Sequence, residues 1–280
     1  MKSVKKVFIP LLLVLSMLLT ACGKPVDSGG NQGTEGQTGE ELSEETEIVI
    51  KPPYPASVKR DGEIIDGGTL NVALVSDTPF QGVFNSFLYE DNYDFQVFQP
   101  MWGNFMKSGP DHEIVDGGYC DVEFDKNTKT ATYKLNKDLT WSDGVPVTSD
   151  DLIFVYECIG HKDYTGVRYD TDYMNVVGME EYHAGSADTI SGMKRIDDKT
   201  LEVTFKEFYP GIMWGAGLTY NAEPAHYLKD VPLKDMASDD KVRLKPLSCG
   251  PFVVSSIVPG ESVEYIPNPY WFGEKPKVDK

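Results

Sequence analysis

The sequence predicts a mixed α/β body over residues 61–280, preceded by a signal segment and a polar linker. Three observations lead to this fold class: several short runs of strand-forming residues, one helix with a clear start and stop, and ample apolar content. Hydrophobic residues make up 40% of the chain and aromatic residues 11%, which is enough for a packed core. Roughly 230 residues follow the acidic stretch of the linker, and they suit one large domain or two smaller ones.

Residues 1–21 are predicted to be a signal peptide. Three lysines among the first six residues precede an apolar run at 7–19, which is too short to span a membrane as a helix. The sequence Leu-Thr-Ala-Cys that ends at Cys22 resembles the bacterial lipobox, in which the cysteine takes a diacylglycerol and becomes the mature N-terminus. The resemblance implies a lipid anchor at Cys22, since two acyl chains hold a protein firmly to a bilayer. The alternative is an ordinary signal peptide with a chance cysteine.

Residues 22–60 are predicted to be a disordered acidic linker. Between Pro25 and Ile50 there is no lysine or arginine, while seven residues are acidic. Such a stretch buries too little apolar surface to offset its ordering entropy, and like charges extend it. We expect a spacer that lifts the body off the membrane. A solubilising acidic tail is the alternative.

The charge of the chain excludes two classes of partner. Removal of residues 1–21 takes away three lysines, so the formal charge changes from −18 to −21. Binding to nucleic acid needs a clustered basic surface, and adsorption to anionic headgroups needs the same. We therefore expect no nucleic-acid partner, and the lipid as the main attachment to the membrane.

Five runs in the body read as strands. Residues 69–75 follow Gly67-Gly68 and are apolar enough to predict a buried strand. Residues 131–135 are rich in strand formers, and residues 201–205 alternate apolar and polar side chains, which predicts one covered and one wet face. Residues 252–254 and 262–266 are predicted to pair, because Pro259-Gly260 can turn the chain between them.

One helix has a defined start and stop. Thr148 and Asp151 have the spacing of a capping box, and two acids lie at the positive end of the helix dipole. Apolar side chains from Leu152 to Ile159 recur at helical spacing, and Gly160 is a natural stop.

No catalytic or metal-binding motif is apparent. Four histidines are scattered without metal-ligand spacing, and the chain lacks a zinc-protease helix, a nucleophile elbow and a P-loop. We expect no enzyme activity, no metal and no cofactor. Three cysteines follow Cys22 and allow at most one disulfide, whose pairing the sequence leaves open. They are Cys120, Cys158 and Cys249.

Three stretches resemble one family, the extracellular solute-binding proteins of oligopeptide-type ABC importers. Residues 139–152 read LTWSDGVPVTSDDL and match the family signature kWSDGxPvTAeDV in order and without gaps. Residues 249–252 and 268–277 resemble the family's GPY and NPxYW patterns, with Cys249 where a small residue is usual. Residues 67–74 resemble the opening GGtLxvA strand, although Ser86 stands where the family has a proline after Asn85.

The resemblance implies a periplasmic-binding-protein type II-like lobe with an inserted subdomain over residues 61–280. Family members are about twice this length, because a second lobe follows the crossover near the NPxYW pattern. We therefore expect the second lobe to be missing from this chain. The signature at 139–152 is expected to be architectural and need not contact ligand.

The resemblance also implies a function. Members close two lobes over a solute, hold extended peptides mainly through backbone hydrogen bonds, and deliver them to a membrane permease with ATPase subunits. We expect a monomer on the extracytoplasmic face of a bacterial cell membrane that binds oligopeptides. Residues 23–280 alone are expected to bind peptide weakly or not at all. The residues that would line the ligand site are Val75, Ser76, Asp77, Phe80, Trp102, Trp214 and Tyr220.

Each of these residues has a simpler interpretation, since Ser76 and Asp77 fit a plain turn and the aromatic residues fit a core. Two other functions also remain open. A surface-tethered hydrolase would have the same signal, linker and body, and a receptor-fold lipoprotein could signal or adhere without a transport partner. Nickel chelates, haem, opines or oligosaccharides are alternative ligands within the family.

Overall fold

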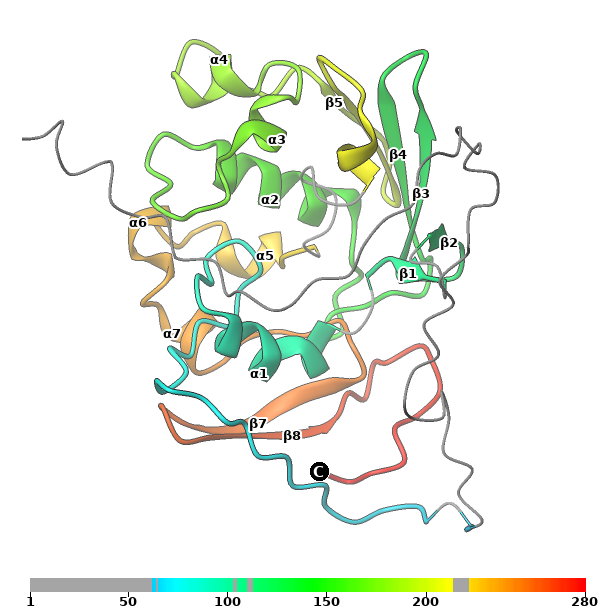
Figure 1. The fold of residues 1–280 in the computed structure, drawn as a ribbon, viewed down its shortest axis with the longest axis vertical. Helices are drawn as coiled ribbons and strands as arrows, with labels where there is room; N and C mark the ends of the chain where they lie inside the picture. The colour runs from blue at the N-terminus through cyan, green and yellow to red at the C-terminus, as the bar shows by residue number, and fades with distance from the viewer. Residues whose placement is uncertain (1–61, 64, 103–104, 110–112, 214–221) are drawn as a thin grey trace, which may run out of the picture. The chain divides into compact units, whose positions relative to one another are not determined.

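In the computed structural model the chain divides into two units, Met1–Asp61 and Gly62–Lys280. The structure describes residues 62–63, 65–102, 105–109, 113–213 and 222–280, all in the second unit (Figure 1). This unit mixes helices with three antiparallel sheets, which confirms the predicted α/β class. No helix among these residues is both long and apolar enough to cross a membrane.

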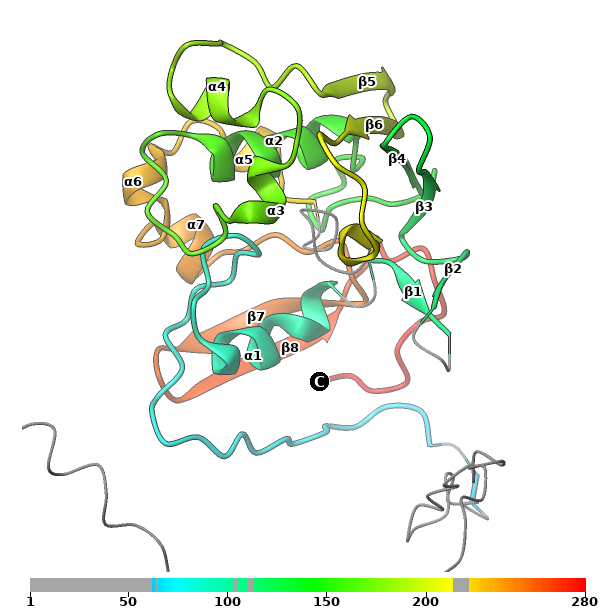
Figure 2. The same cartoon turned by 45° about the horizontal axis from the view of Figure 1, so that its top comes forward.

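A four-stranded antiparallel sheet contributes to the larger of the two hydrophobic cores (Figure 2). Its strand order is β3 (Cys120–Asp125), β4 (Thr130–Leu135), β6 (Thr200–Thr204) and β5 (Met193–Asp197). The inward-facing side chains of the two central strands are buried, whereas their alternate residues stay partly exposed. The predicted strands at 131–135 and 201–205 are therefore confirmed. The face of the sheet that points away from the core is partly exposed to solvent, as predicted.

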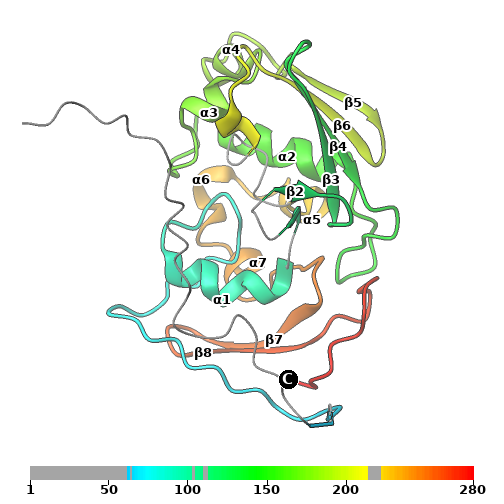
Figure 3. The same cartoon turned by 45° about the vertical axis from the view of Figure 1, so that its right-hand side comes forward.

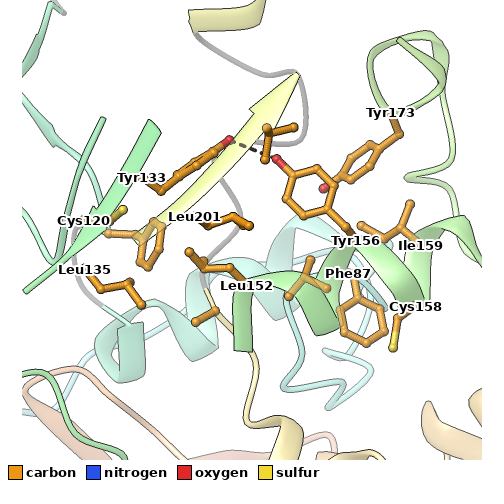
Figure 4. Packing of buried hydrophobic residues seen from close by; sticks show 14 of the residues in the cluster. Phe87, Cys120, Tyr133, Leu135, Leu152, Tyr156, Cys158, Ile159, Tyr173 and Leu201 are labelled. Carbon is orange, nitrogen blue, oxygen red and sulfur yellow. Dashed lines mark hydrogen bonds between the residues drawn. The ribbon is translucent and has the colours of Figure 1, made fainter. Parts of the chain in front are cut away.

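The helix α2 (Ser149–Gly160) packs on this sheet and begins as predicted. The Asp151 carboxylate accepts a hydrogen bond from the backbone nitrogen of Thr148 at 2.8 Å, which satisfies a donor that the helix cannot pair. Figure 4 shows side chains from α2 and from the sheet in one core, where the Tyr133 and Tyr156 hydroxyls lie 2.9 Å apart. That hydrogen bond lets two phenols be buried among apolar groups.

A second, smaller core lies between the helix α1 (Asn92–Trp102) and a hairpin. The hairpin consists of β7 (Phe252–Val258) and β8 (Ser262–Pro267), as the sequence predicts, and Gly260 turns the chain with φ +74°. Figure 3 shows α1 lying along one face of this hairpin. Its core contains Phe84, Phe98, Met101 and Trp102, packed against Val254, Ile257, Val263 and Tyr265 among others.

Shorter elements complete the described part of the chain. They are the antiparallel pair β1 (Lys107–Ser108) and β2 (Ile114–Val115), the helices α3 (Thr171–Met174), α4 (Met179–His183), α5 (Ala225–Leu228), α6 (Leu233–Met236) and α7 (Asp240–Arg243), and a 3-10 helix at Pro210–Met213.

One predicted element is wrong: residues 69–75 do not form a buried strand. The exposed fraction of the residue is 81% for Val72 and 91% for Val75, and no described residue pairs with the backbone of residues 71–75. An apolar run is buried only where other elements cover it, and none of the described elements covers this one.

The three cysteines of the body are buried and free, so no disulfide joins them. Burial raises the pKa of each thiol, because an apolar surrounding disfavours the thiolate. These thiols therefore behave as small apolar core groups.

Candidate functional site

The predicted ligand loop follows the exposed run 69–75 and is held against the start of α1. The Tyr93 hydroxyl in the first turn of α1 donates to Oδ1 of Asp77 at 2.9 Å. This hydrogen bond raises the pKa of the Tyr93 phenol, since losing its proton would place two negative charges together. The bond fixes the direction of an otherwise exposed carboxylate.

A buried carboxylate anchors the end of the same loop. Asp94, one residue further along α1, accepts hydrogen bonds from the backbone nitrogens of Gly82 at 2.9 Å and Val83 at 3.1 Å. Its burial raises its pKa, and these two bonds oppose the rise. A guanidinium bond from Arg243 of α7 to the carbonyl of Gln81 adds a second attachment. Hydrogen bonds thus attach the C-terminal end of the loop to α1 and α7, while residues 76–79 stay exposed.

The structure brings some of the predicted site residues together and separates another. Val75, Ser76 and Asp77 are exposed and Phe80 is half-buried, and all four lie in the same loop. Trp102 lies at the far end of α1, is 2% exposed, and packs its ring 4.1 Å from that of Phe98. Trp214, Tyr220 and Cys22 lie outside the described residues.

Tyr93 and Asp94 attach the predicted loop to α1 but are not predicted from the sequence. Their only local signal is an acidic residue in the first turn of a helix, which by itself indicates a favourable dipole contact. Tyr93 binds the Asp77 carboxylate and Asp94 binds two backbone nitrogens, all 11 to 16 residues earlier in the chain, and nothing in the pattern indicates that approach.

The family signature at 139–152 joins separate segments of the fold. Trp141 is fully buried, and its indole nitrogen donates to Oδ2 of Asp151 at 3.2 Å. The neighbouring turn meets the second motif, because the backbone nitrogen of Ser142 donates to the carbonyl of Ser248 at 2.7 Å. Ser248 in turn donates from its backbone nitrogen to the Ser142 hydroxyl at 3.1 Å. Two stretches more than 100 residues apart therefore form one joint.

A buried polar cluster lies beside this joint and was not predicted. Glu223 is 3% exposed, and its Oε1 accepts a hydrogen bond of 2.6 Å from the backbone nitrogen of Ser86. Burial raises the pKa of Glu223 to about 8, and the nearby Asp151 carboxylate adds to the rise. The Ser86 hydroxyl and the Asn85 amide nitrogen are buried without a partner among the described residues. Because this cluster is closed to solvent, we interpret it as a junction between segments and not as a ligand surface.

Metal binding has no support in the described ranges. They contain no group of three or more histidine, cysteine, aspartate or glutamate residues arranged to hold an ion.

Comparison with known proteins gives one family. A family model described as bacterial extracellular solute-binding proteins, family 5 Middle, matches residues 120–280. The oligopeptide-binding protein OppA of Lactococcus lactis subsp. cremoris (strain SK11) is 43% identical over 214 residues, which cover 73% of this chain and 35% of the relative. OppA of Mycobacterium tuberculosis is 26% identical over 284 residues, which cover 95% of this chain and 42% of the relative.

Solved structures give the same result. Lactococcal OppA, complexed with an endogenous peptide in the closed conformation, superposes with a TM-score of 0.69 at 42% identity. The match covers 73% of this chain and 39% of that one. The oligopeptide-binding protein AppA from Bacillus subtilis, in complex with a nonapeptide, shares the fold with a TM-score of 0.62 at 20% identity, covering 78% and 40%. The chain thus spans little more than a third of the length of these relatives.

These matches confirm the predicted periplasmic-binding-protein type II-like lobe. The sequence signature, the joint that it forms with the second motif and the family match over residues 120–280 agree. The chain belongs to the bacterial extracellular solute-binding proteins, family 5.

Proposed function

We propose that this chain is part of a receptor that captures oligopeptides outside the cell and delivers them to an ABC permease driven by its ATPase subunits. The observation that carries the proposal is the 43% identity to a protein named for oligopeptide binding, together with the 0.69 TM-score to a peptide-bound structure. The receptor acts as a monomer, needs no cofactor and does not transform its ligand.

The N-terminal segments give the proposed location. Residues 1–21 direct export and are removed, Cys22 carries the lipid, and residues 22–60 form the linker to the lobe at 61–280. The receptor then works at the extracytoplasmic face of the cell membrane. Its strongly negative body leaves the lipid as the main attachment.

The proposed ligand surface is the loop that begins at Val75. The resemblance to the family implies that ligand lies at the end of the opening strand, which corresponds to this loop. Ser76 and Asp77 offer exposed polar groups there, and Phe80 offers an apolar one. The hydrogen bond from Tyr93 orients the Asp77 carboxylate before ligand arrives, which lowers the entropy lost on binding. Trp102 packs against Phe98 in the small core, and Trp214 and Tyr220 are proposed as further walls.

Growth on peptides tests the transport function. A strain that carries this gene and is auxotrophic for one amino acid is given that amino acid either free or inside a peptide of three to six residues. We expect deletion of the gene to abolish growth on the peptide and to leave growth on the free amino acid unchanged. Unchanged growth on peptides after deletion would contradict the proposal.

Metabolic labelling tests the anchor separately. Radiolabelled palmitate should enter the wild-type protein but not a Cys22→Ala variant. The variant should also lose its attachment to the membrane fraction. Equal labelling of both proteins would rule out Cys22 as the lipidation site.

A further inference from the structure

Helix α1 is attached to separate segments of the chain at both of its ends. In its first turn, Tyr93 and Asp94 bind the loop at 77–83. In its last turn, the Met101 carbonyl needs a donor from elsewhere, because the last four carbonyls of an α-helix have no intrahelical partner. A helix of 11 residues is about 16 Å long, so the two attachments lie far apart.

The joint between the two family motifs supplies the donors for Met101. The backbone nitrogen of Gly250 donates to the Met101 carbonyl at 2.7 Å, and the Ser248 hydroxyl can donate to the same oxygen. Ser248 is fully buried and also exchanges two hydrogen bonds with Ser142 of the signature. A Cβ atom at Gly250 would lie 2.2 Å from the Met101 oxygen, so only glycine allows this approach. The end of α1 is therefore in direct contact with the joint.

Packing makes α1 a rigid connection between its two ends. The helix lies along one face of the β7–β8 hairpin (Figure 3), and Phe98, Met101 and Trp102 are buried in the small core there. The Tyr265 hydroxyl of β8 donates to the carbonyl of Val97 in the middle of the helix. Since β7 begins directly after the joint, the hairpin and α1 shift together. A close-packed interior deforms little, so a displacement of Met101 reaches the first turn of the helix.

We propose that α1 couples the loop from Val75 to Phe80 to the joint, so that Ser248 positions Asp77 without contacting it. This inference rests on the proposed function only in that the loop is taken as a ligand surface. A coupling free energy is reciprocal, so a change at Asp77 alters the joint as much as a change at the joint alters Asp77. A ligand group that displaces the loop would therefore change the hydrogen bonds of the joint.

Ser248→Ala tests the coupling from the joint. The substitution removes one buried hydroxyl from the end of α1. We expect hydrogen exchange at the Gly82 and Val83 amides of the full chain to speed up at least about threefold. The pKa of the Tyr93 phenol is raised mainly by its hydrogen bond to Asp77, and in an NMR titration it should move toward the ordinary value of 10.0.

Gly178→Ala is the control for a general loss of stability. A Cβ at this position would meet the Ser191 backbone at 2.6 Å, and α4, which follows Gly178, lies apart from α1 in Figures 1 and 3. We expect Gly178→Ala to leave the Tyr93 titration and the exchange of the loop amides unchanged. Equal effects of Gly178→Ala and Ser248→Ala, or no effect of Ser248→Ala, would overturn the proposal.

Tyr93→Phe tests the coupling from the other end, because it removes only the hydroxyl that binds Asp77. It should speed up exchange at the Gly250 amide by a similar factor. Unchanged exchange at Gly250 would overturn the proposal, even where Ser248→Ala does not fold. Neither measurement uses peptide. Failure of the coupling is therefore distinguishable from failure of the proposed function, which the growth assay detects by itself.

Discussion

Glu223→Gln tests whether a buried, protonated carboxyl makes the stability of this fold depend on pH. Glutamine has the size of protonated glutamate, and its carbonyl oxygen can accept the 2.6 Å hydrogen bond from the Ser86 nitrogen. The substitution therefore removes the titration and keeps the packing. The pKa of Glu223 is raised from 4.5 to about 8 by burial first and by the Asp151 carboxylate last among its causes.

The direction of the effect follows from the raised pKa. Between about pH 4.5 and pH 8 the folded state holds a proton that the unfolded state releases, so the free energy of unfolding falls as pH rises. The stabilisation is fully present below about pH 4.5 and is lost by about pH 8. Each pH unit in this window corresponds to about 1.4 kcal/mol, so a rise from about pH 5.5 to about pH 7.5 should cost up to about 3 kcal/mol. For a unit of this size, that lowers the melting temperature by roughly 6–12 °C.

Urea unfolding at three pH values measures this difference. The wild type should lose up to about 3 kcal/mol more than Glu223→Gln over the same pH range. Glu261→Gln, in the exposed turn of the β7–β8 hairpin, is the matched control and should follow the wild type. All other titrating groups are common to the three proteins. Parallel pH profiles for the wild type and Glu223→Gln would refute the reasoning.

Three further predictions follow from the same structure. Trp141→Ala should lower the free energy of unfolding by about 3–5 kcal/mol in urea, because the indole is fully buried; exposed Tyr270→Ala should change it by less than about 1 kcal/mol, and equal losses would contradict this. Gly178→Ala should destabilise more than Gly185→Ala by about 1–3 kcal/mol. Both glycines have positive φ, but only at Gly178 would a Cβ lie 2.6 Å from a facing backbone nitrogen, so equal melting temperatures would argue against the clash. Residues 23–280 should bind peptide weakly or not at all in calorimetry, since one lobe offers only part of the contacts, and micromolar affinity would disprove this.

The sequence predicts those helices and strands whose caps, turns and apolar spacing all lie within the element itself. The helix at 149–160 has its cap and its stop within 13 residues, and the hairpin at 252–267 has its turn between two apolar runs. The edge strands β3 and β5 are not predicted, because charged residues interrupt their apolar pattern. Only pairing with β4 and β6 shows that these stretches are strands.

The candidate site also has one part that the sequence located and another that only the structure shows. The resemblance to the family located the loop from Val75 to Phe80, and the structure describes it as an exposed loop. Its attachment by Tyr93 and Asp94 depends on contacts between separate elements, and no local pattern specifies those contacts. An aromatic residue such as Trp102 can line a pocket or fill a core. Here the hairpin packs against α1 and Trp102 is buried in the core between them.

By itself the sequence determined the α/β class, the capped helix, the hairpin and the family, because each rests on neighbouring residues or on an ungapped signature. Only the tertiary structure decided that residues 69–75 are exposed, that burial raises the pKa of Glu223, and that the motifs at 141–148 and 248–251 meet. Burial and long-range hydrogen bonds depend on which segments come together in space. The apolar pattern of a segment shows that it can be buried. It does not show which other segments of the fold will cover it.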